Sequence, residues 1–124
     1  MSLLLLEPDR ATRQLYAREL GKRWHVVAVE QPDDVLAILE TQPISAVILE
    51  LGASAEDNWQ LLALVKARVE RSTLPIIICS SIDERGKGYE FGVSAYLVKP
   101  VSPSQLSYEV SRWLADSPGV DEGK

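Results

Sequence analysis

The stretch Ala46-Val47-Ile48-Leu49-Glu50-Leu51-Gly52 decides the fold that we expect for this chain. A continuous apolar run bounded by turn signals predicts a short strand that is buried on both faces of a sheet. In a parallel sheet, the carboxyl ends of the strands open onto the crevice in which ligands bind. Glu50 follows the apolar run directly, so we expect its carboxylate at that edge of the sheet.

The composition narrows the class of protein. The chain has 124 residues, of which 46% are hydrophobic and 25% charged, as is usual for one soluble domain. Its formal net charge of -5 argues against nucleic-acid binding by this domain, because neutralising phosphates requires a basic patch. Cys79 is the single cysteine, and the apolar run at 3–6 is too short for a signal peptide or a membrane span. We therefore expect a cytoplasmic protein that binds no membrane.

Apolar runs alternate with helical patterns along the whole chain. We expect further strands at 3–6, 24–29, 75–79 and 95–98, and helices at 10–22, 32–42, 58–70, 83–91 and 103–116. Two glycines make the helix at 83–91 a weak one. Ala11, Leu15 and Leu20 of the first helix, and Leu106, Val110, Trp113 and Leu114 of the last, are expected to face the core. Five strands alternating with five helices predict a doubly wound α/β fold with a parallel sheet.

Polar side chains follow four of the five predicted strands. They are Glu7 and Asp9 after the first strand, Glu50 after the third, Ser80 after the fourth and Lys99 after the fifth. The carboxyl ends of parallel strands meet at one edge, so these groups should converge there. Acids, a hydroxyl and a lysine in one crevice suggest a site for a phosphoryl group, a metal ion or both.

Over about residues 3–116 the chain resembles the receiver domain of two-component response regulators. In that family an acidic pair follows the first strand, a phospho-accepting aspartate the third, a Ser or Thr the fourth, and a Lys-Pro the fifth. Glu7 matches the first acid, Ser80 the hydroxyl, and Lys99-Pro100 the Lys-Pro. Tyr96, three residues before the lysine, matches the aromatic switch position of the family.

This resemblance implies both a structure and a kind of partner. It implies a flavodoxin-like sheet of five strands in the order 2-1-3-4-5, with a cis peptide bond before Pro100. A receiver domain at 1–116 would be followed by a polar tail or the start of a linker at 117–124. Such a domain works in a phosphorelay, is not itself an enzyme, and binds a histidine kinase or a fused output domain. The resemblance places this contact on the fourth helix, fifth strand and fifth helix, a surface that includes Tyr96.

The sequence departs from the family pattern at the phosphorylation site. Glu50 stands where the phospho-accepting aspartate belongs, and Pro8 stands where the second acid belongs. A longer acid and a residue without a side-chain oxygen should weaken both in-line attack and a Mg²⁺ site, because Mg²⁺ demands near-octahedral oxygen ligands. A magnesium ion held by Glu7, Glu50 and Gly52 is therefore expected to be weak or absent, and no other cofactor is indicated. We predict a pseudo-receiver that signals by protein–protein interaction.

The roles of the strand-end residues stay open at this point. Glu50 fits a silent salt bridge to Lys99, or imitation of a phosphorylated aspartate that reaches Ser80 and Lys99, or residual acceptance of phosphate. Glu7 and Asp9 fit capping of the first helix as well as metal binding. Each of these alternatives predicts a different set of contacts.

Three further assignments and two other functions remain possible from the sequence. Tyr96 fits a half-buried packing residue or a mobile switch, and Asp57 fits an N-cap of the third helix or an alternative phosphoacceptor. Cys79 is expected to be a small core residue. The chain could also be a normal Mg²⁺-dependent phosphoacceptor receiver, or an unrelated flavodoxin-like domain that binds a small ligand. The last of these lacks a glycine-rich phosphate loop after the first strand.

Overall fold

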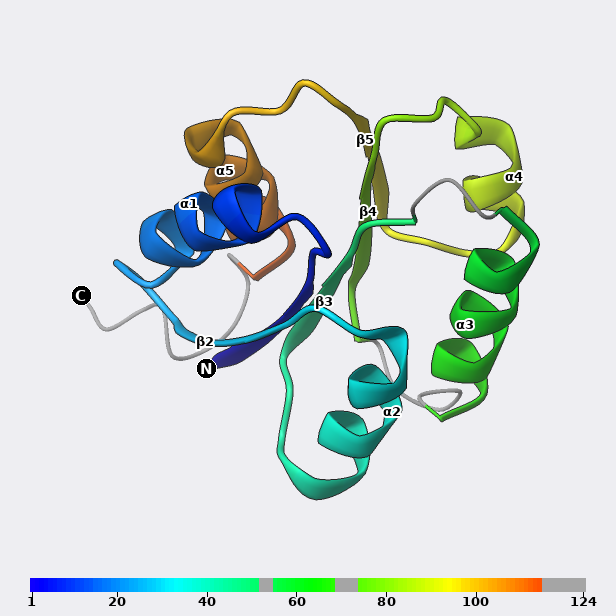
Figure 1. The fold of residues 1–124 in the computed structure, drawn as a ribbon, viewed down its shortest axis with the longest axis horizontal. Coiled ribbons are helices and arrows are strands. Elements are labelled where there is room, and N and C mark those ends of the chain that lie inside the picture. Colours follow the sequence, from blue (N-terminus) through cyan, green and yellow to red (C-terminus); the bar gives the residue numbers. More distant parts are fainter. Residues whose placement is uncertain (52–54, 69–73, 115–124) are drawn as a thin grey trace.

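The structure is a computed structural model that describes residues 1–51, 55–68 and 74–114, and only the backbone of 55–58. Strands and helices alternate through these residues as the sequence predicts (Figure 1). In chain order the elements are β1 (Ser2–Leu6), α1 (Arg10–Leu20), β2 (His25–Val29), α2 (Pro32–Thr41), β3 (Ala46–Leu49), α3 (Ala55–Arg68), β4 (Ile76–Ser80), α4 (Arg85–Glu90), β5 (Ala95–Val98) and α5 (Pro103–Leu114). Gly52 and the expected tail at 117–124 lie outside the described residues.

The five strands form one parallel sheet in the order β2-β1-β3-β4-β5, which confirms the predicted topology. Helices α1 and α5 lie on one side of the sheet, and α2, α3 and α4 lie on the other (Figure 1). Successive strand side chains point to opposite faces. Leu3 and Leu5 therefore pack in the core under α1 and α5, while Leu4 and Leu6 pack in the core under α2 and α3. Both faces of the sheet are covered, so its carboxyl edge is where polar groups can reach the surface.

Helix α1 buries a different stripe from the one expected. Leu15 is 52% exposed and Ala11 is exposed as well, whereas Tyr16 and Leu20 are buried. Tyr16 and Leu20 are four residues apart and share one face of the helix, from which Leu15 is turned by about 100°. The prediction for Leu15 and Ala11 was wrong because it passed over a tyrosine that can be buried once its hydroxyl has a partner.

Trp113 of α5 is 42% exposed, although we expected it to face the core. The inward stripe of the helix is taken by Leu106, Val110 and Leu114, which repeat at intervals of four residues. Trp113 lies beside this stripe, and its indole N–H donates a hydrogen bond to the Glu109 carboxylate at 3.0 Å. A polar partner on the surface therefore satisfies a side chain that the hydrophobic pattern alone would bury.

The helix ends follow the predicted capping chemistry at two places. Asp9 caps α1 by accepting a hydrogen bond from the backbone N–H three residues later, at 2.9 Å. Ser102 and Gln105 form a capping box at α5, with reciprocal hydrogen bonds of 2.8 and 3.1 Å. The backbone of α3 begins at Ala55, so Asp57 belongs to the first turn of that helix and is not its N-cap. Acidic residues are favourable at both positions, and the sequence alone could not separate them.

Among the helices of residues 1–51, 55–68 and 74–114, none combines the length and the apolar character that crossing a bilayer requires.

Candidate functional site

The carboxyl ends of three strands bring Glu7, Glu50 and Lys99 together at one edge of the sheet. The parallel hydrogen-bond ladder continues beyond the strand ends and positions these residues. The Glu50 N–H donates to the Leu6 carbonyl at 3.0 Å, and the Lys99 N–H donates to the Ser80 carbonyl at 2.8 Å. The convergence expected from the sequence is therefore present for these three side chains.

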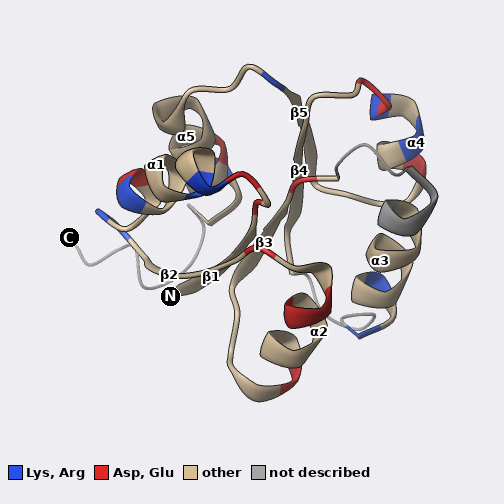
Figure 2. Cartoon of the chain, in the orientation of Figure 1, with Lys and Arg blue, Asp and Glu red and all other residues tan. Residues whose placement is uncertain are grey.

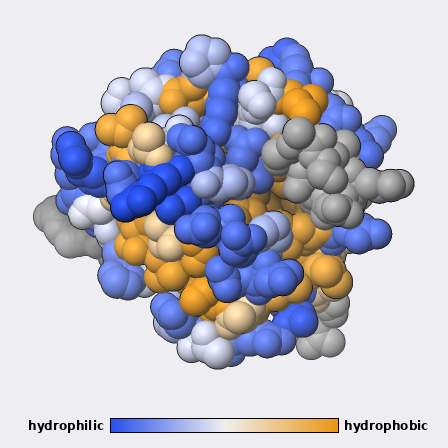
Figure 3. Space-filling view, in the orientation of Figure 1, coloured by the Kyte–Doolittle hydropathy of each residue, from blue (hydrophilic) through white to orange (hydrophobic). Residues whose placement is uncertain are grey.

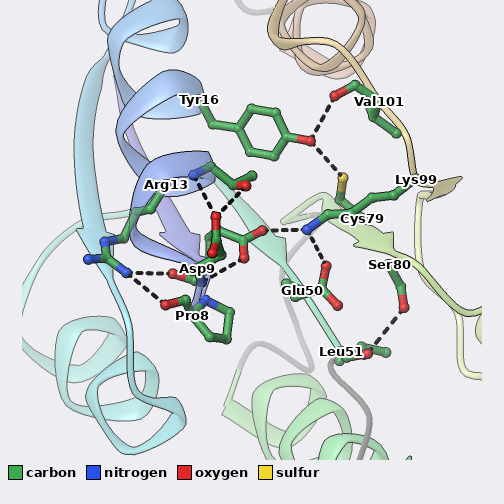
Figure 4. Close-up of polar contacts among 12 residues, drawn as sticks. Pro8, Asp9, Arg13, Tyr16, Glu50, Leu51, Cys79, Ser80, Lys99 and Val101 are labelled. Atoms are coloured by element: carbon green, nitrogen blue, oxygen red, sulfur yellow. Dashed lines mark hydrogen bonds and ion pairs between the residues drawn. The ribbon is translucent and has the colours of Figure 1, made fainter.

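The ammonium group of Lys99 lies between two buried carboxylates. Its Nζ is 2.7 Å from Glu7 Oε1, to which it donates a hydrogen bond, and 2.7 Å from Glu50 Oε1 (Figure 4). The second contact is an ion pair, and Glu50 Oε1 is not assigned a hydrogen bond among the described residues. The Glu7 and Glu50 side chains are 3% and 8% exposed. We call these three residues the Glu7–Lys99–Glu50 cluster.

Burial and charge act in opposite directions within this cluster. Desolvation raises the pKa of Glu50, and the charge of Glu7 adds to this rise, while Lys99 opposes it. Desolvation would lower the pKa of Lys99, but its two carboxylate partners outweigh burial and raise it. Lys99 therefore keeps its proton at neutral pH, whereas burial disfavours the charged form of Glu50.

The loop after β1 is acidic (Figure 2), and its carboxylates are engaged by the chain itself. Asp9 Oδ2 accepts hydrogen bonds from Thr12 N at 2.9 Å and from Thr12 Oγ1 at 2.7 Å, and these bonds lower the pKa of Asp9. Glu7 Oε2 accepts from the Asp9 N–H at 3.0 Å. Pro8 has no side-chain oxygen, and its carbonyl accepts from Arg13 at 3.3 Å. Asp9 is thus a helix cap, as one of the two alternatives held.

The carboxylates of Glu7, Asp9 and Glu50 do not fit a magnesium site. Mg²⁺ takes a near-octahedral shell of oxygens. One oxygen of Glu7 accepts from Lys99 and the other from a backbone N–H, while Asp9 caps α1 and Glu50 faces the ammonium. Within the part of the chain that is described, no three His, Cys, Asp or Glu side chains are grouped closely enough to hold a metal ion. Gly52, the third ligand proposed from the resemblance, lies outside that part.

Ser80 and Tyr96 contact the connection between β4 and α4. Ser80 Oγ donates to the Leu51 carbonyl at 3.1 Å and accepts from the Ile82 N–H at 3.1 Å. Tyr96 is 5% exposed, and its hydroxyl donates to the Ile82 carbonyl at 2.6 Å and accepts from the Glu84 N–H at 3.2 Å. Hydrogen bonds therefore link the end of β3, through Ser80 and Tyr96, to the start of α4.

Sequence reasoning missed the role of Tyr16. Its hydroxyl donates to the Val101 carbonyl at 2.8 Å and lies 3.8 Å from Cys79 Sγ (Figure 4). This contact ties α1 to the loop that follows the cis Lys99–Pro100 peptide bond. Burial raises the pKa of Tyr16 and raises that of Cys79 to about 11, so both groups stay protonated at neutral pH. The available signal was the position of Tyr16 four residues before a leucine expected in the core.

Comparison with known proteins finds a transcriptional regulatory protein and a two-component response regulator among the relatives. No protein-family model matches the chain. The chain is 28% identical over 115 residues to the transcriptional regulatory protein HprR of Escherichia coli K12, covering 92% of this chain and 52% of HprR. It is 32% identical over 98 residues to the two-component response regulator ORR11 of Oryza sativa subsp. indica, covering 76% and 67% of the two chains.

The fold is also shared with solved structures. The chemotaxis response regulator CheY4 of Vibrio cholerae superposes with a TM-score of 0.80 at 18% identity, over 91% of this chain and 98% of CheY4. The BeF3-activated DrrB receiver domain superposes with a TM-score of 0.78 at 20% identity, over 92% and 97%. This chain spans about half the length of HprR.

Proposed function

The chain belongs to the family of two-component response regulators, in which it is a receiver domain, and we propose that it signals by binding a protein partner without being phosphorylated. One observation carries the proposal. Lys99 pairs with both Glu7 and Glu50, the two acids that would have to serve a metal ion and a phosphoryl group. The site is thus neutralised largely by a cation of the chain itself.

Phosphoryl transfer depends on the positions of the acceptor oxygen and of the cation that neutralises developing charge. Glu50 is one methylene longer than an aspartate, and its Oε1 faces the Lys99 ammonium. A misplacement of about 1 Å can lower a rate about a hundredfold. Pro8 removes a further oxygen from the loop that would share the metal ion. These features together support loss of phosphate acceptance.

We further propose that Glu50 is a structural ion-pair partner and does not imitate a phosphorylated aspartate. Imitation would bring its carboxylate to Ser80 as well as to Lys99. Ser80 Oγ instead donates to the Leu51 carbonyl and accepts from the Ile82 N–H, so its hydroxyl is engaged by backbone. This arrangement supports a structural role for the Glu7–Lys99–Glu50 cluster at the sheet edge. It also supports hydrogen bonds of Ser80 that do not depend on the charge of Glu50.

The partner is proposed to dock on the surface of α4, β5 and α5. Hydrophilic residues cover most of the face seen in Figure 3, with apolar residues between them. Large apolar side chains are nevertheless exposed on the two helices of the proposed surface: Tyr89 is 53% exposed, Tyr108 66% and Trp113 42%. Exposed aromatic residues are frequent at protein interfaces. A histidine kinase and a fused output domain are the two classes of partner that the family suggests.

A labelling experiment tests this function. The protein is incubated with a small-molecule phosphodonor and Mg²⁺, and its intact mass is recorded. The double variant Pro8→Asp, Glu50→Asp, which restores both acids, is the matched control. We expect the variant to gain a phosphoryl group and the native protein to gain none. A phosphorylated native protein would overturn the proposal, and mapping the acceptor would then distinguish Glu50 from Asp9 and Asp57.

A further inference from the structure

Helix α4 approaches β5 unusually closely at Gly88. This helix has only six residues, and Gly88 is the one that it buries. A Cβ atom added at Gly88 would lie 2.6 Å from Cδ2 and 3.2 Å from Cε2 of Tyr96. The first distance is far inside van der Waals contact, and the second is tighter than an ordinary contact. The ring of Tyr96 therefore occupies the space that any other residue at position 88 would fill.

The Tyr96 ring cannot yield this space freely because both ends of the residue are bonded to the α4 region. Its hydroxyl donates to the Ile82 carbonyl at 2.6 Å and accepts from the Glu84 N–H at 3.2 Å. Its backbone N–H donates to the Tyr89 hydroxyl at 3.3 Å. A pivot of the ring away from position 88 would break the hydroxyl contacts, and a shift of α4 would strain the contact with Tyr89.

We propose that Gly88 is a positioning residue that holds Tyr96 in its buried place, and that this interlock fixes the α4–β5 surface in one arrangement without phosphorylation. The inference rests on the proposed function only in taking this surface as the one that a partner contacts. The interlock itself is a property of the isolated domain, so it is testable without any partner.

Backbone geometry gives no other reason for a glycine at this position. Among the described residues, Gly92 is the glycine with a positive φ, at 90°, and Gly88 keeps the helical conformation. Gly86 lies in the same helix, and a Cβ added there would meet nothing within 4 Å. An alanine at Gly86 or at Gly88 gains the same helix propensity. The two positions therefore differ in the contact with Tyr96 and provide a matched comparison.

The test compares Gly88→Ala with Gly86→Ala by hydrogen exchange at the Glu84 and Tyr96 amides, which bond to the two tyrosine hydroxyls. We expect Gly88→Ala to speed exchange at both amides about tenfold, since overpacking of this kind displaces the ring or the helix. Gly86→Ala should leave exchange at both amides unchanged or slower. Equal exchange rates at these amides in the two alanine variants would overturn the proposal.

A second background keeps the test decisive if Gly88→Ala fails to fold. A Tyr96→Val variant lacks the ring, so adding Gly88→Ala to it should not lower the thermal midpoint further. If Gly88→Ala alone fails to fold, the double variant should fold. A loss as large as in the native background would contradict the interlock. Neither readout involves a phosphoryl group or a partner. Phosphorylation of the native protein would therefore overturn the proposed function and leave the interlock standing.

Discussion

Lys99 Nζ lies 2.7 Å from Glu50 Oε1, and the Glu50 side chain is only 8% exposed. A buried carboxylate is costly unless it is paired, and removing one partner of a buried pair leaves an uncompensated charge. Lys99 also pairs with a second buried carboxylate, Glu7, to which it donates a hydrogen bond. The stability of the sheet edge therefore depends on this lysine more than on either acid alone.

The first prediction concerns Lys99 itself. Replacing Lys99 with Met keeps the length of the side chain but leaves Glu7 and Glu50 buried without their cation. Because Lys99 is 20% exposed, we expect a loss at or just below the lower end for a buried pair, about 2–3 kcal/mol in the free energy of unfolding. Urea denaturation measures this loss. Lys22→Met is the control: Lys22 is 65% exposed and pairs with Glu19 on the surface, so it should change stability by about 0.5 kcal/mol or less.

The second prediction concerns the pH dependence of stability. Burial raises the folded-state pKa of Glu50 above its usual value of 4.5. The folded protein then binds the proton more tightly than the unfolded chain, so this group contributes stability at low pH that is lost as pH rises through the raised pKa. Glu50→Gln removes that titration. We expect the variant to gain stability relative to the native protein as pH rises from 4.5 to neutral. A Glu50→Gln curve that runs parallel to the native curve would contradict the prediction.

The third prediction concerns Tyr16. Tyr16→Phe removes the hydroxyl that donates to the Val101 carbonyl and leaves that carbonyl without its partner. We expect the free energy of unfolding to fall by about 1 kcal/mol, as for other lost hydrogen bonds. The matched control is Tyr108→Phe, because Tyr108 is 66% exposed and its loss of a hydroxyl should be nearly neutral. Equal effects of the two substitutions in urea denaturation would show that the Val101 contact contributes nothing.

The fold could be predicted because several local signals agree. The apolar run at 46–49 is buried on both faces, as its composition indicates, and the alternation of strands with helices specifies a parallel sheet. The capping box at Ser102 and Gln105 marks the start of α5 correctly. The buried faces of two helices were predicted in part only. Tyr16 was passed over and Trp113 was placed wrongly, because each side chain is amphipathic and the position of its polar partner decides whether it is buried.

The site could be predicted only in part. The strand ends specify which residues meet, and Lys99 does lie between acids. The direction in which a short polar side chain turns depends on backbone groups that the sequence does not locate. Ser80 accordingly bonds to the Leu51 carbonyl, and Gly88, which the sequence marks only as a poor helix residue, lies against Tyr96. Such contacts join segments that are distant in sequence.

The central claim is that Lys99, and not a divalent cation, neutralises the acids at the sheet edge. The most direct test is a titration of the native protein with Mg²⁺, monitored by the amide chemical shifts of Glu7, Glu50 and Lys99. The Pro8→Asp, Glu50→Asp variant is titrated beside it. We predict no saturable shift of these amides in the native protein at millimolar Mg²⁺ and a saturable shift in the variant. Saturable Mg²⁺ binding by the native protein at these residues would contradict the claim.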